Sequence, residues 1–543
     1  MNKLSAVKQA CDEVIGEWIK PGSPGAAVAV RWGDEEPYLG SYGLADLEQE
    51  TAIRPSTPFH VASISKHFTC ACGVLLAEQG ALDLSDRVRG YIPELAPYAD
   101  PITIEQLMCH TAGVRDQWDL MKLAGWREGD IYSHDDALSM ILRQQAGNFE
   151  AGSYWSYSNA GYTLLAELLQ RVSGRSLRDL AQELLFAPLQ MDSTHFQDDC
   201  TELIPHRARA YVEAEDGGFR SADPCFDVVG TTGLITTAED MCKWDAHLRQ
   251  AINSESALHQ LAKPHSLTDG RVVRYGLGLF LSEIDGLEVV EHGGSDGGYL
   301  CHYLTFPDDD FFVFVCGNTP IPTPAMTVAI ARRLLHGGTA LARVQPSGHR
   351  AATSGVFRDV ASGSAVRLRT EGNQSFFGFD GLEHGKHVAR LFASESVPVS
   401  PVEAEGFYVI VGDNDRERFT ISPDLTELAF QPCLYRAIEE VFSRVESDWE
   451  TPQTASPDPG DAYLFDSEEL DTRISFTVGK ERATVQGQRF GPVSMEQIGP
   501  LAFACAGLTA DLEMQEEQVS ALRLTTLGVY GIRLLRTDLM QGQ

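Results

Sequence analysis

The stretch TPFHVASISKHFTCACGVLLAEQG, residues 57–80, places a serine and a lysine at the start of an apolar helix. Ser63 and Lys66 are three positions apart, so their side chains lie on one face of the predicted helix. A serine hydroxyl becomes a good nucleophile when a nearby base takes its proton, and a lysine amine can do so when burial lowers its pKa. The spacing predicts a nucleophile with its activating amine, and the alternative is a capping serine beside a surface lysine.

The same spacing occurs earlier in the chain, at Ser5 and Lys8. We interpret that pair as a chance match on a first amphipathic helix. Serine and lysine at this spacing are therefore weak evidence alone, and the interpretation of Ser63 and Lys66 depends on motifs further along the chain.

The second motif is FEAGSYWSYSNAGY, residues 149–162. Tyr157 and Asn159 lie at the entry of a helix predicted over residues 158–174, with Gly174 as its C-terminal cap. A tyrosine beside a cationic lysine can act as a general base and later protonate the leaving group. The asparagine amide can orient that lysine and donate to a substrate carbonyl. The alternative is that Tyr157 packs and Asn159 only caps the helix.

The third motif is EHGGSDGGY, residues 291–299, which satisfies the pattern G-x-S-x-G. A nucleophile elbow needs a helix after the serine, but YLCHYLTF predicts a strand, so we reject the elbow. We expect His292 and Gly294 on an edge strand facing Ser63, where glycine lets a substrate backbone approach. The N–H groups of Ser295 and Ser63 would then form an oxyanion hole. A packed structural histidine is the alternative for His292.

Composition narrows the function classes. With 543 residues the chain is too long for one hydrophobic core. Its net charge of −34 repels nucleic acid and anionic membranes, and fits a solvated acidic surface better than a cationic substrate. No apolar run approaches the about 20 residues that span a bilayer. Residues 1–20 lack the uninterrupted apolar segment of a secretory signal.

The eleven cysteines are scattered without a C-x-x-C pair, and several lie in apolar runs, as Cys316 and Cys505 do. The pattern predicts reduced, mostly buried thiols in the cytoplasm rather than a disulfide framework or a zinc site. Neither an H-E-x-x-H pattern nor a P-loop signature occurs, so the sequence predicts no metal or nucleotide cofactor.

Changes of composition divide the chain into three parts. Residues 1–340 mix helical and strand-like segments, beginning with a hairpin of AAVAVRW and PYLGSYG. Two segments, 336–353 and 447–463, are interpreted as linkers. Short alternating runs follow each of them. We predict a catalytic domain at 1–340 and two small antiparallel β domains, barrel or sandwich, at 350–445 and 460–543.

Taken together and in this order, Ser63-x-x-Lys66, Tyr157-x-Asn159 and His292-x-Gly294 resemble the three motifs of the penicillin-recognising serine hydrolases. The closest group is the class C beta-lactamase and D-Ala-D-Ala carboxypeptidase type. Stretches such as LMCHTAGVRD and GTTGLITTAEDMCKW are similar too, so the resemblance covers about residues 10–340. It implies an α/β (α+β) catalytic domain, in which a helical subdomain lies beside an antiparallel sheet flanked by helices, with the active site between them.

Within that family, VASISKHFTC and the two trailing β domains look most like bacterial D-aminopeptidases. This resemblance implies a beta-lactamase/penicillin-binding-protein-like catalytic domain followed by two antiparallel β-barrels. It implies that the protein is a serine peptidase or amidase that releases N-terminal D-amino acids from peptides, amides or esters. The implied roles are Ser63 as the acylated nucleophile, Lys66 as its activator, Tyr157 as base and acid, and Asn159 and His292 as positioning groups.

The residue type at position 292 gives information about the substrate class. Members of the resembled family usually carry a basic residue at this motif, which holds a substrate carboxylate. A histidine is mostly neutral at pH 7 and is a poorer anion anchor, which favours amide, ester or aminopeptidase substrates. The acid that would bind a substrate amine stays open among Asp116, Asp296 and Glu496.

Several alternatives remain. Residues 486–499 look shorter than the loop that limits the D-aminopeptidases to releasing one N-terminal residue. One alternative is therefore an endopeptidase that acts on linear peptides with D-residues, as in linearised microcystin degradation. An esterase or weak beta-lactamase on the same machinery is another. A non-catalytic peptide- or penicillin-binding protein belongs to a different class. We expect the β domains to cover the site or to hold a homodimer.

Overall fold

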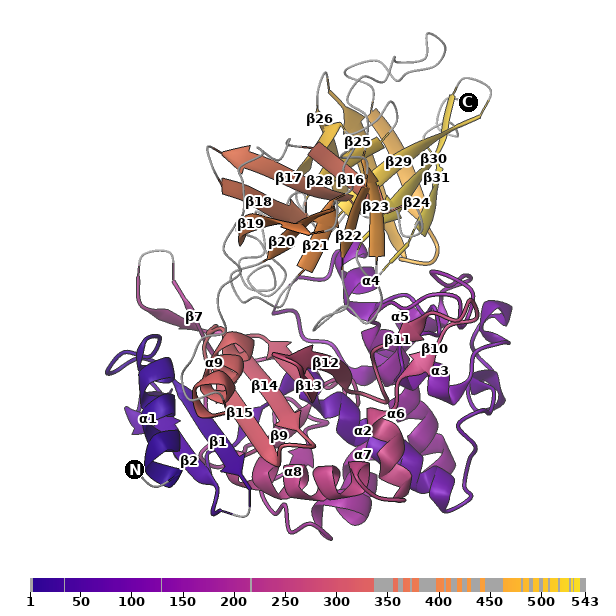
Figure 1. Cartoon of the computed structure of the whole chain (residues 1–543). Coiled ribbons are helices and arrows are strands. Elements are labelled where there is room, and N and C mark those ends of the chain that lie inside the picture. The colour runs from indigo at the N-terminus through magenta and orange to yellow at the C-terminus, as the bar shows by residue number, and fades with distance from the viewer. Residues whose placement is uncertain are drawn as a thin grey trace.

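The computed structural model describes residues 3–335 except 34, 128, 215 and 216, eight strands between 355 and 444, and most of 462–537. Residues 3–335 contain a twisted antiparallel sheet with helices on both of its faces (Figure 1). The linker segment 336–353 and most of 447–463 lie outside the described residues.

The central sheet has six strands in the order β12-β13-β14-β15-β1-β2. They are β1 (Ala26–Trp32), β2 (Tyr38–Tyr42), β12 (Phe280–Ile284), β13 (Leu287–Asp296), β14 (Tyr299–Phe306) and β15 (Phe311–Gly317). The predicted hairpin of β1 and β2 is confirmed. A strand, β14, follows Ser295 and pairs with β13, so the rejection of a nucleophile elbow is also confirmed.

Alternate residues of each strand face opposite helical layers. In β1, Val28 packs with α1 (Lys3–Gly16) and α9 (Thr323–Leu335), whereas Ala27 packs in the core shared with α8 (Ala238–Ile252). The central strands are therefore buried on both faces and read as continuous apolar runs.

The helical layer beside the sheet is built around α2 (Ser65–Glu78), in which nearly every residue is buried. Its other helices are α3 (Ile104–Met108), α4 (Gln117–Leu123), α5 (His134–Leu142), α6 (Asn159–Ser173) and α7 (Leu177–Ala181). The helix predicted at 158–174 is confirmed as α6, and Gly174 ends it with a φ of 67°.

Short strands connect these layers. They are β3 (Leu44–Asp46), β4 (Thr51–Ala52), β5 (Phe59–His60), β6 (His195–Phe196), β7 (Tyr211–Glu213), β8 (Phe219–Ser221), β9 (Leu234–Thr236), β10 (His265–Ser266) and β11 (Val272–Val273). The pairing of β5 with β9 matters most, because it fixes the chain immediately before Ser63.

Two eight-stranded antiparallel barrels follow, each closed by pairing of its first and last strands. The first comprises β16 (Gly355–Asp359), β17 (Ala365–Glu371), β18 (Gln374–Phe379), β19 (Val397–Ala404), β20 (Phe407–Val411), β21 (Arg418–Ile421), β22 (Glu427–Phe430) and β23 (Glu440–Arg444). The second comprises β24 (Ala462–Ser467), β25 (Thr472–Val478), β26 (Arg482–Gly487), β27 (Val493–Gln497), β28 (Ala502–Cys505), β29 (Leu508–Gln515), β30 (Gln518–Thr525) and β31 (Ile532–Arg536).

The second barrel packs on the helical layer. Leu120 and Met121 of α4 and Met140 of α5 belong to the same apolar cluster as the barrel interior. A buried ion pair joins the Nη1 atom of Arg115 to Oε2 of Glu469 at 2.5 Å. This docking places the barrel next to the segment that carries the second motif.

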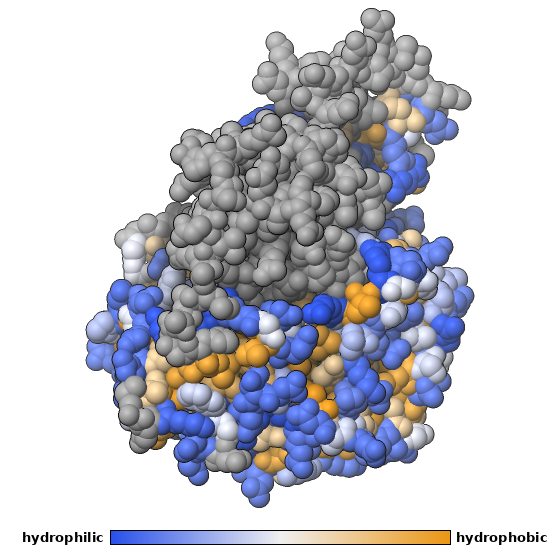
Figure 2. All heavy atoms as spheres, in the orientation of Figure 1, coloured by the Kyte–Doolittle hydropathy of each residue, from blue (hydrophilic) through white to orange (hydrophobic). Residues whose placement is uncertain are grey.

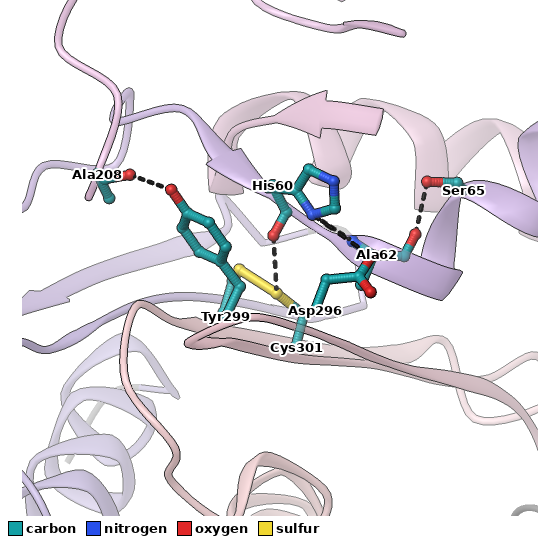
Figure 3. The surroundings of a disulfide bond; sticks show 8 residues. His60, Ala62, Ser65, Ala208, Asp296, Tyr299 and Cys301 are labelled. Carbon is teal, nitrogen blue, oxygen red and sulfur yellow. Dashed lines mark hydrogen bonds and ion pairs between the residues drawn. A yellow bond between two sulfur atoms is a disulfide. The ribbon is translucent and has the colours of Figure 1, made fainter. Parts of the chain in front are cut away.

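The cysteine prediction was wrong for one pair. Cys301 and Cys316 form a disulfide, because they lie directly opposite each other on β14 and β15, with their Cα atoms 4.1 Å apart (Figure 3). Spacing along the chain gives no sign of this cross-strand pairing. Seven further cysteines within the described residues are free thiols, while the side chain of Cys505 lies outside them.

The outer surface is predominantly hydrophilic on the face drawn in Figure 2, with smaller hydrophobic patches between the polar side chains. Such a surface accommodates the net charge of −34. Within the described residues, no helix combines the length and apolar character that crossing a bilayer requires.

Candidate active site

Ser63 lies in a strained turn. It is the middle residue of the 3₁₀ helix η1 (Ala62–Ile64), which runs directly into α2. Ala62 has a φ of 49°, an uncommon conformation for a residue with a side chain. The Ala62 N–H donates to Nδ1 of His60 at 3.2 Å, and Ser65 Oγ donates to the Ala62 carbonyl at 2.5 Å (Figure 3). These two bonds hold the turn that presents Ser63.

Lys66 lies one helical turn beyond Ser63 and is completely buried. Its Nζ atom donates to Ser63 Oγ at 3.0 Å, to Asn159 Oδ1 at 2.8 Å and to the Thr231 carbonyl at 2.8 Å. An ammonium group has three N–H donors, so all three are occupied. When Lys66 is neutral, its two N–H groups can stay on Asn159 and Thr231 while the lone pair faces the Ser63 hydroxyl.

The pKa of Lys66 makes this neutral form accessible. Burial lowers it to about 7, against the opposing effect of the negative charges of Asp296 and Asp116. A lysine with a pKa near neutrality is suited to take the proton of a serine hydroxyl.

The earlier serine and lysine of the same spacing lie in a different environment. Ser5 and Lys8 lie on the exposed side of α1, and Lys8 Nζ donates to Asp12 Oδ2 at 2.5 Å. Their interpretation as a chance match agrees with this geometry.

Tyr157 and Asn159 both reach Lys66. The Lys66 Nζ atom lies 4.8 Å from the centre of the Tyr157 ring, so the ammonium faces the aromatic ring. His110 holds Tyr157 from both sides, since its carbonyl accepts from the Ser156 N–H and its Nδ1 accepts from the Ser158 N–H, each at 3.1 Å. The rings of His110 and Tyr157 are 4.3 Å apart.

Asp116 orients Asn159. Its Oδ2 atom accepts the Asn159 backbone N–H at 2.6 Å and the Asn159 Nδ2 at 2.8 Å. Its Oδ1 atom caps α4 by accepting the Trp118 N–H at 2.9 Å, with Asp119 N–H at 3.4 Å. Asp116 therefore turns the Asn159 carbonyl oxygen toward Lys66, and both of its own oxygens are occupied.

His292 is buried rather than open to a substrate. Its Nδ1–H donates to the Gly293 carbonyl at 2.6 Å, which leaves Nε2 to accept from the Tyr275 hydroxyl at 3.2 Å. Burial, followed by the charge of Lys66, lowers the pKa of His292 to about 3. The ring is thus neutral, as the sequence suggested, and offers no positive charge to a substrate carboxylate.

Gly294 and Ser295 lie where β13 passes the turn at residues 62–64 that carries Ser63, called the nucleophile turn below. A Cβ atom on Gly294 would sit 2.2 Å from the Val61 carbonyl oxygen, so glycine is required for β13 to approach η1. The close contact at this glycine is thus with the protein's own chain, whereas the sequence suggested a substrate backbone. Ser295 pairs with Leu300 across β13 and β14.

The structure thus brings Ser63, Lys66, Tyr157, Asn159 and His292 into one group of contacts. Sequence reasoning missed Thr231, His60 and Tyr275, and it did not give Asp116 its position beside Asn159. Thr231 lies within GTTGLITTAED, a stretch that carries the family resemblance, but it binds Lys66 through a backbone carbonyl, which leaves no chemical signal in the sequence.

The comparisons with known proteins identify the family. A family model described as Beta-lactamase matches residues 9–338, so the chain belongs to the beta-lactamase family of serine hydrolases. A D-aminopeptidase of Brucella ovis is 31% identical over 306 residues, 54% of this chain and 56% of that protein. The matched region therefore spans little more than half the length of this curated relative.

Two solved structures share the fold at lower identity. The octameric penicillin-binding protein homologue from Pyrococcus abyssi has a TM-score of 0.56 and 18% identity, covering 81% of this chain and 99% of its own. The D-amino acid amidase from Ochrobactrum anthropi has a TM-score of 0.53 and 18% identity, covering 62% and 99%.

Proposed function

We propose that the protein is a serine peptidase or amidase that forms an acyl-enzyme on Ser63 and releases N-terminal D-amino acids from peptides, amides or esters. The observation that carries this proposal is the position of Lys66 Nζ, which lies 3.0 Å from Ser63 Oγ while Asn159 and Thr231 hold its other N–H groups. The family membership and the D-aminopeptidase relative support the choice of reaction and substrate.

In the first half of the reaction, neutral Lys66 takes the proton of Ser63 and the Ser63 oxygen attacks the scissile carbonyl. The N–H groups of Ser63 and Ser295 are our candidates for stabilising the oxyanion. In this proposal the protonated Lys66, aided by Tyr157, returns a proton to the departing amine, which leaves Lys66 neutral again. Neutral Lys66 then takes a proton from water, the water oxygen attacks the ester on Ser63, and Lys66 returns the proton to the departing Ser63 oxygen.

His292 is buried and neutral, so the third motif offers no positive charge to a substrate carboxylate next to the scissile bond. A carboxypeptidase substrate carries that carboxylate and needs a cation to hold it. An aminopeptidase, amidase or esterase substrate does not. This favours release of an N-terminal residue over carboxypeptidase action.

The remaining predictions concern the loop at 486–499, the location of the protein and its assembly. The sequence 486–499 is described only in part, and the side chain of Glu496 is outside the described residues, so the endopeptidase alternative stays a prediction. A cytoplasmic location is supported by the seven free thiols among the described residues and opposed by the Cys301–Cys316 disulfide. A homodimer also stays a prediction.

The test is release of p-nitroaniline from D-alanine p-nitroanilide and from its L-isomer. Wild type, Ser63→Ala and the matched control Ser5→Ala, which alters the exposed copy of the motif, are assayed side by side. We expect wild type and Ser5→Ala to act only on the D-isomer, and Ser63→Ala to act on neither. Absence of turnover of both isomers by wild type would contradict the proposal, and N-blocked peptides with an internal D-residue would then test the endopeptidase alternative.

A further inference from the structure

Asp296 is the last residue of β13, one position beyond Ser295. Because side chains alternate along a strand, Asp296 projects to the same face as His292 and Gly294. That face meets the nucleophile turn, since the position of a Cβ on Gly294 lies against Val61 and Ala62. The carboxylate of Asp296 therefore lies on the catalytic side of the sheet.

Two neighbouring side chains, Thr232 and His60, contact the Asp296 carboxylate. Its Oδ2 atom accepts a hydrogen bond from the Thr232 hydroxyl. The same atom lies 3.9 Å from Nδ1 of His60 (Figure 3). His60 does not neutralise it, because its Nδ1 accepts the Ala62 N–H and burial lowers its pKa to about 3. Thr232 follows Thr231, whose carbonyl binds Lys66, so Asp296 borders the catalytic lysine.

Asp296 also differs from the other acid in the site. Asp116 has both oxygens occupied by four N–H groups and is 6% exposed. The side chain of Asp296 is 16% exposed, and its Oδ1 atom accepts no hydrogen bond from any residue that the structure describes. One carboxylate thus serves the protein's own amide groups, and the other has an oxygen open at the site.

Lys66 does not satisfy that oxygen. Its three N–H groups are directed to Ser63, Asn159 and Thr231, and in the form that activates Ser63 it carries no charge. An open carboxylate beside a neutral lysine is an environment that attracts a cation.

We propose that Asp296 binds the α-ammonium group of the substrate, and that this contact makes the enzyme select acyl groups with a free N-terminus. The proposal rests on the function proposed above and gives it a residue for recognising the N-terminus. A primary ammonium fits because it has three N–H donors and can bind Oδ1 while the Thr232 hydroxyl stays on Oδ2.

The test compares two p-nitrophenyl esters that share a three-carbon acyl chain and differ only in the amine: D-alanine p-nitrophenyl ester and p-nitrophenyl propionate. The variant is Asp296→Asn, which keeps the size and the Thr232 contact, and the control is Glu288→Gln, an exposed acid on the same strand. At about pH 7.5, above the Lys66 pKa of about 7, removing the charge of Asp296 leaves Lys66 mostly neutral. There we expect Asp296→Asn to lower kcat/KM for the amine substrate by about 30-fold or more and to leave propionate hydrolysis within about threefold of wild type. Glu288→Gln should change neither.

Equal losses on both substrates, or no loss on either, would overturn the proposal, because Asp296 would then only shape the site or have no role. A third readout separates this from failure of the proposed function. D-alaninamide should inhibit propionate hydrolysis competitively in wild type and about 30-fold more weakly in Asp296→Asn. If wild type binds D-alaninamide but never hydrolyses D-alanine p-nitroanilide, the proposed function fails while the Asp296 site stands; if D-alaninamide inhibits both proteins equally, the Asp296 site fails.

Discussion

Asp116 accepts two hydrogen bonds from Asn159, one from the backbone N–H at 2.6 Å and one from the side-chain amide at 2.8 Å. These bonds direct the Asn159 side-chain carbonyl oxygen toward Lys66. The same carboxylate caps α4, whose residues Leu120 and Met121 pack into the second barrel. Asp116 thus links Lys66, through Asn159, to α4, and α4 packs against the second barrel.

Asp116→Asn should lower kcat by about 10²-fold, because an amide cannot accept every N–H that the carboxylate binds and Asn159 loses its orientation. The charge of Asp116 also raises the pKa of Lys66, so its removal should move the acidic limb of the pH profile to lower pH. Asp135→Asn, in the first turn of α5, is the control. An unchanged kcat with an unshifted pH profile would contradict this role.

The pH dependence of kcat/KM should report Lys66. Burial lowers its pKa to about 7, while Asp296, Asp116 and Cys70 oppose that shift. Since only the neutral amine can take the Ser63 proton, kcat/KM should fall as the pH decreases through about 7. Lys66→Met should abolish measurable turnover. A kcat/KM that stays constant from pH 8 down to about pH 5 would exclude Lys66 as the base.

His60 should matter through the backbone of the nucleophile turn. Its Nδ1 is the acceptor for the Ala62 N–H, and Ala62 holds an uncommon positive φ. His60→Leu leaves that N–H without a partner and should cost about 1 to 3 kcal/mol of stability as well as activity. His60→Asn, whose Oδ1 can replace Nδ1, should restore most of both.

Thermal unfolding and kcat measured on the same preparations check this prediction. If His60→Asn behaves like His60→Leu, the lost bond to Ala62 is not the cause of the defect.

The contact between the second barrel and the catalytic region can be tested with two ion pairs. Arg115 is buried and pairs with Glu469, whereas Arg143 and Asp471 form an exposed pair across the same two parts. Glu469→Gln should lower the unfolding free energy by about 1 to 2 kcal/mol, because it removes the charged partner of a buried guanidinium. Asp471→Asn should change it by less than about 0.5 kcal/mol.

Denaturant titration of both variants gives the comparison. Equal effects would mean that the burial of Arg115 does not decide the strength of the contact.

The barrel also touches the second motif directly. Tyr530 donates its hydroxyl hydrogen to Ser156 Oγ at 3.0 Å, and its own N–H donates to Asn148 Oδ1 at 2.8 Å. Ser156 precedes Tyr157 by one residue. Tyr530→Phe should therefore lower kcat by a few fold with little change in KM, measured on the D-alanine anilide.

Much of this arrangement could be predicted from the sequence. Apolar runs beside turn residues predicted β1, β2 and β14, because a buried strand and a tight turn have local signatures. The helix ending at Gly174 was predicted for the same reason. The three motifs supplied the candidates for the catalytic residues. Ser63 lies just before α2, Tyr157 and Asn159 lie at the start of α6, and His292 lies on β13, which contacts the turn beside Ser63.

Other features depend on tertiary contacts that leave no local pattern. Asp116 lies 43 positions before Asn159, and Thr231 binds Lys66 from 165 positions away, through a backbone carbonyl that any residue carries. Cys301 and Cys316 meet only because of the register of β14 and β15. Gly294 looked like a substrate contact because sequence cannot show that Val61 occupies that space.

The central claim is that Ser63 becomes acylated. The most direct measurement is intact-protein and peptide mass spectrometry of enzyme quenched with acid during turnover of D-alanine p-nitrophenyl ester. The account predicts that wild type gains the mass of one D-alanyl group on the peptide containing Ser63, and that Ser63→Ala gains none. Turnover by wild type without an adduct on that peptide, or the same adduct in Ser63→Ala, would contradict it.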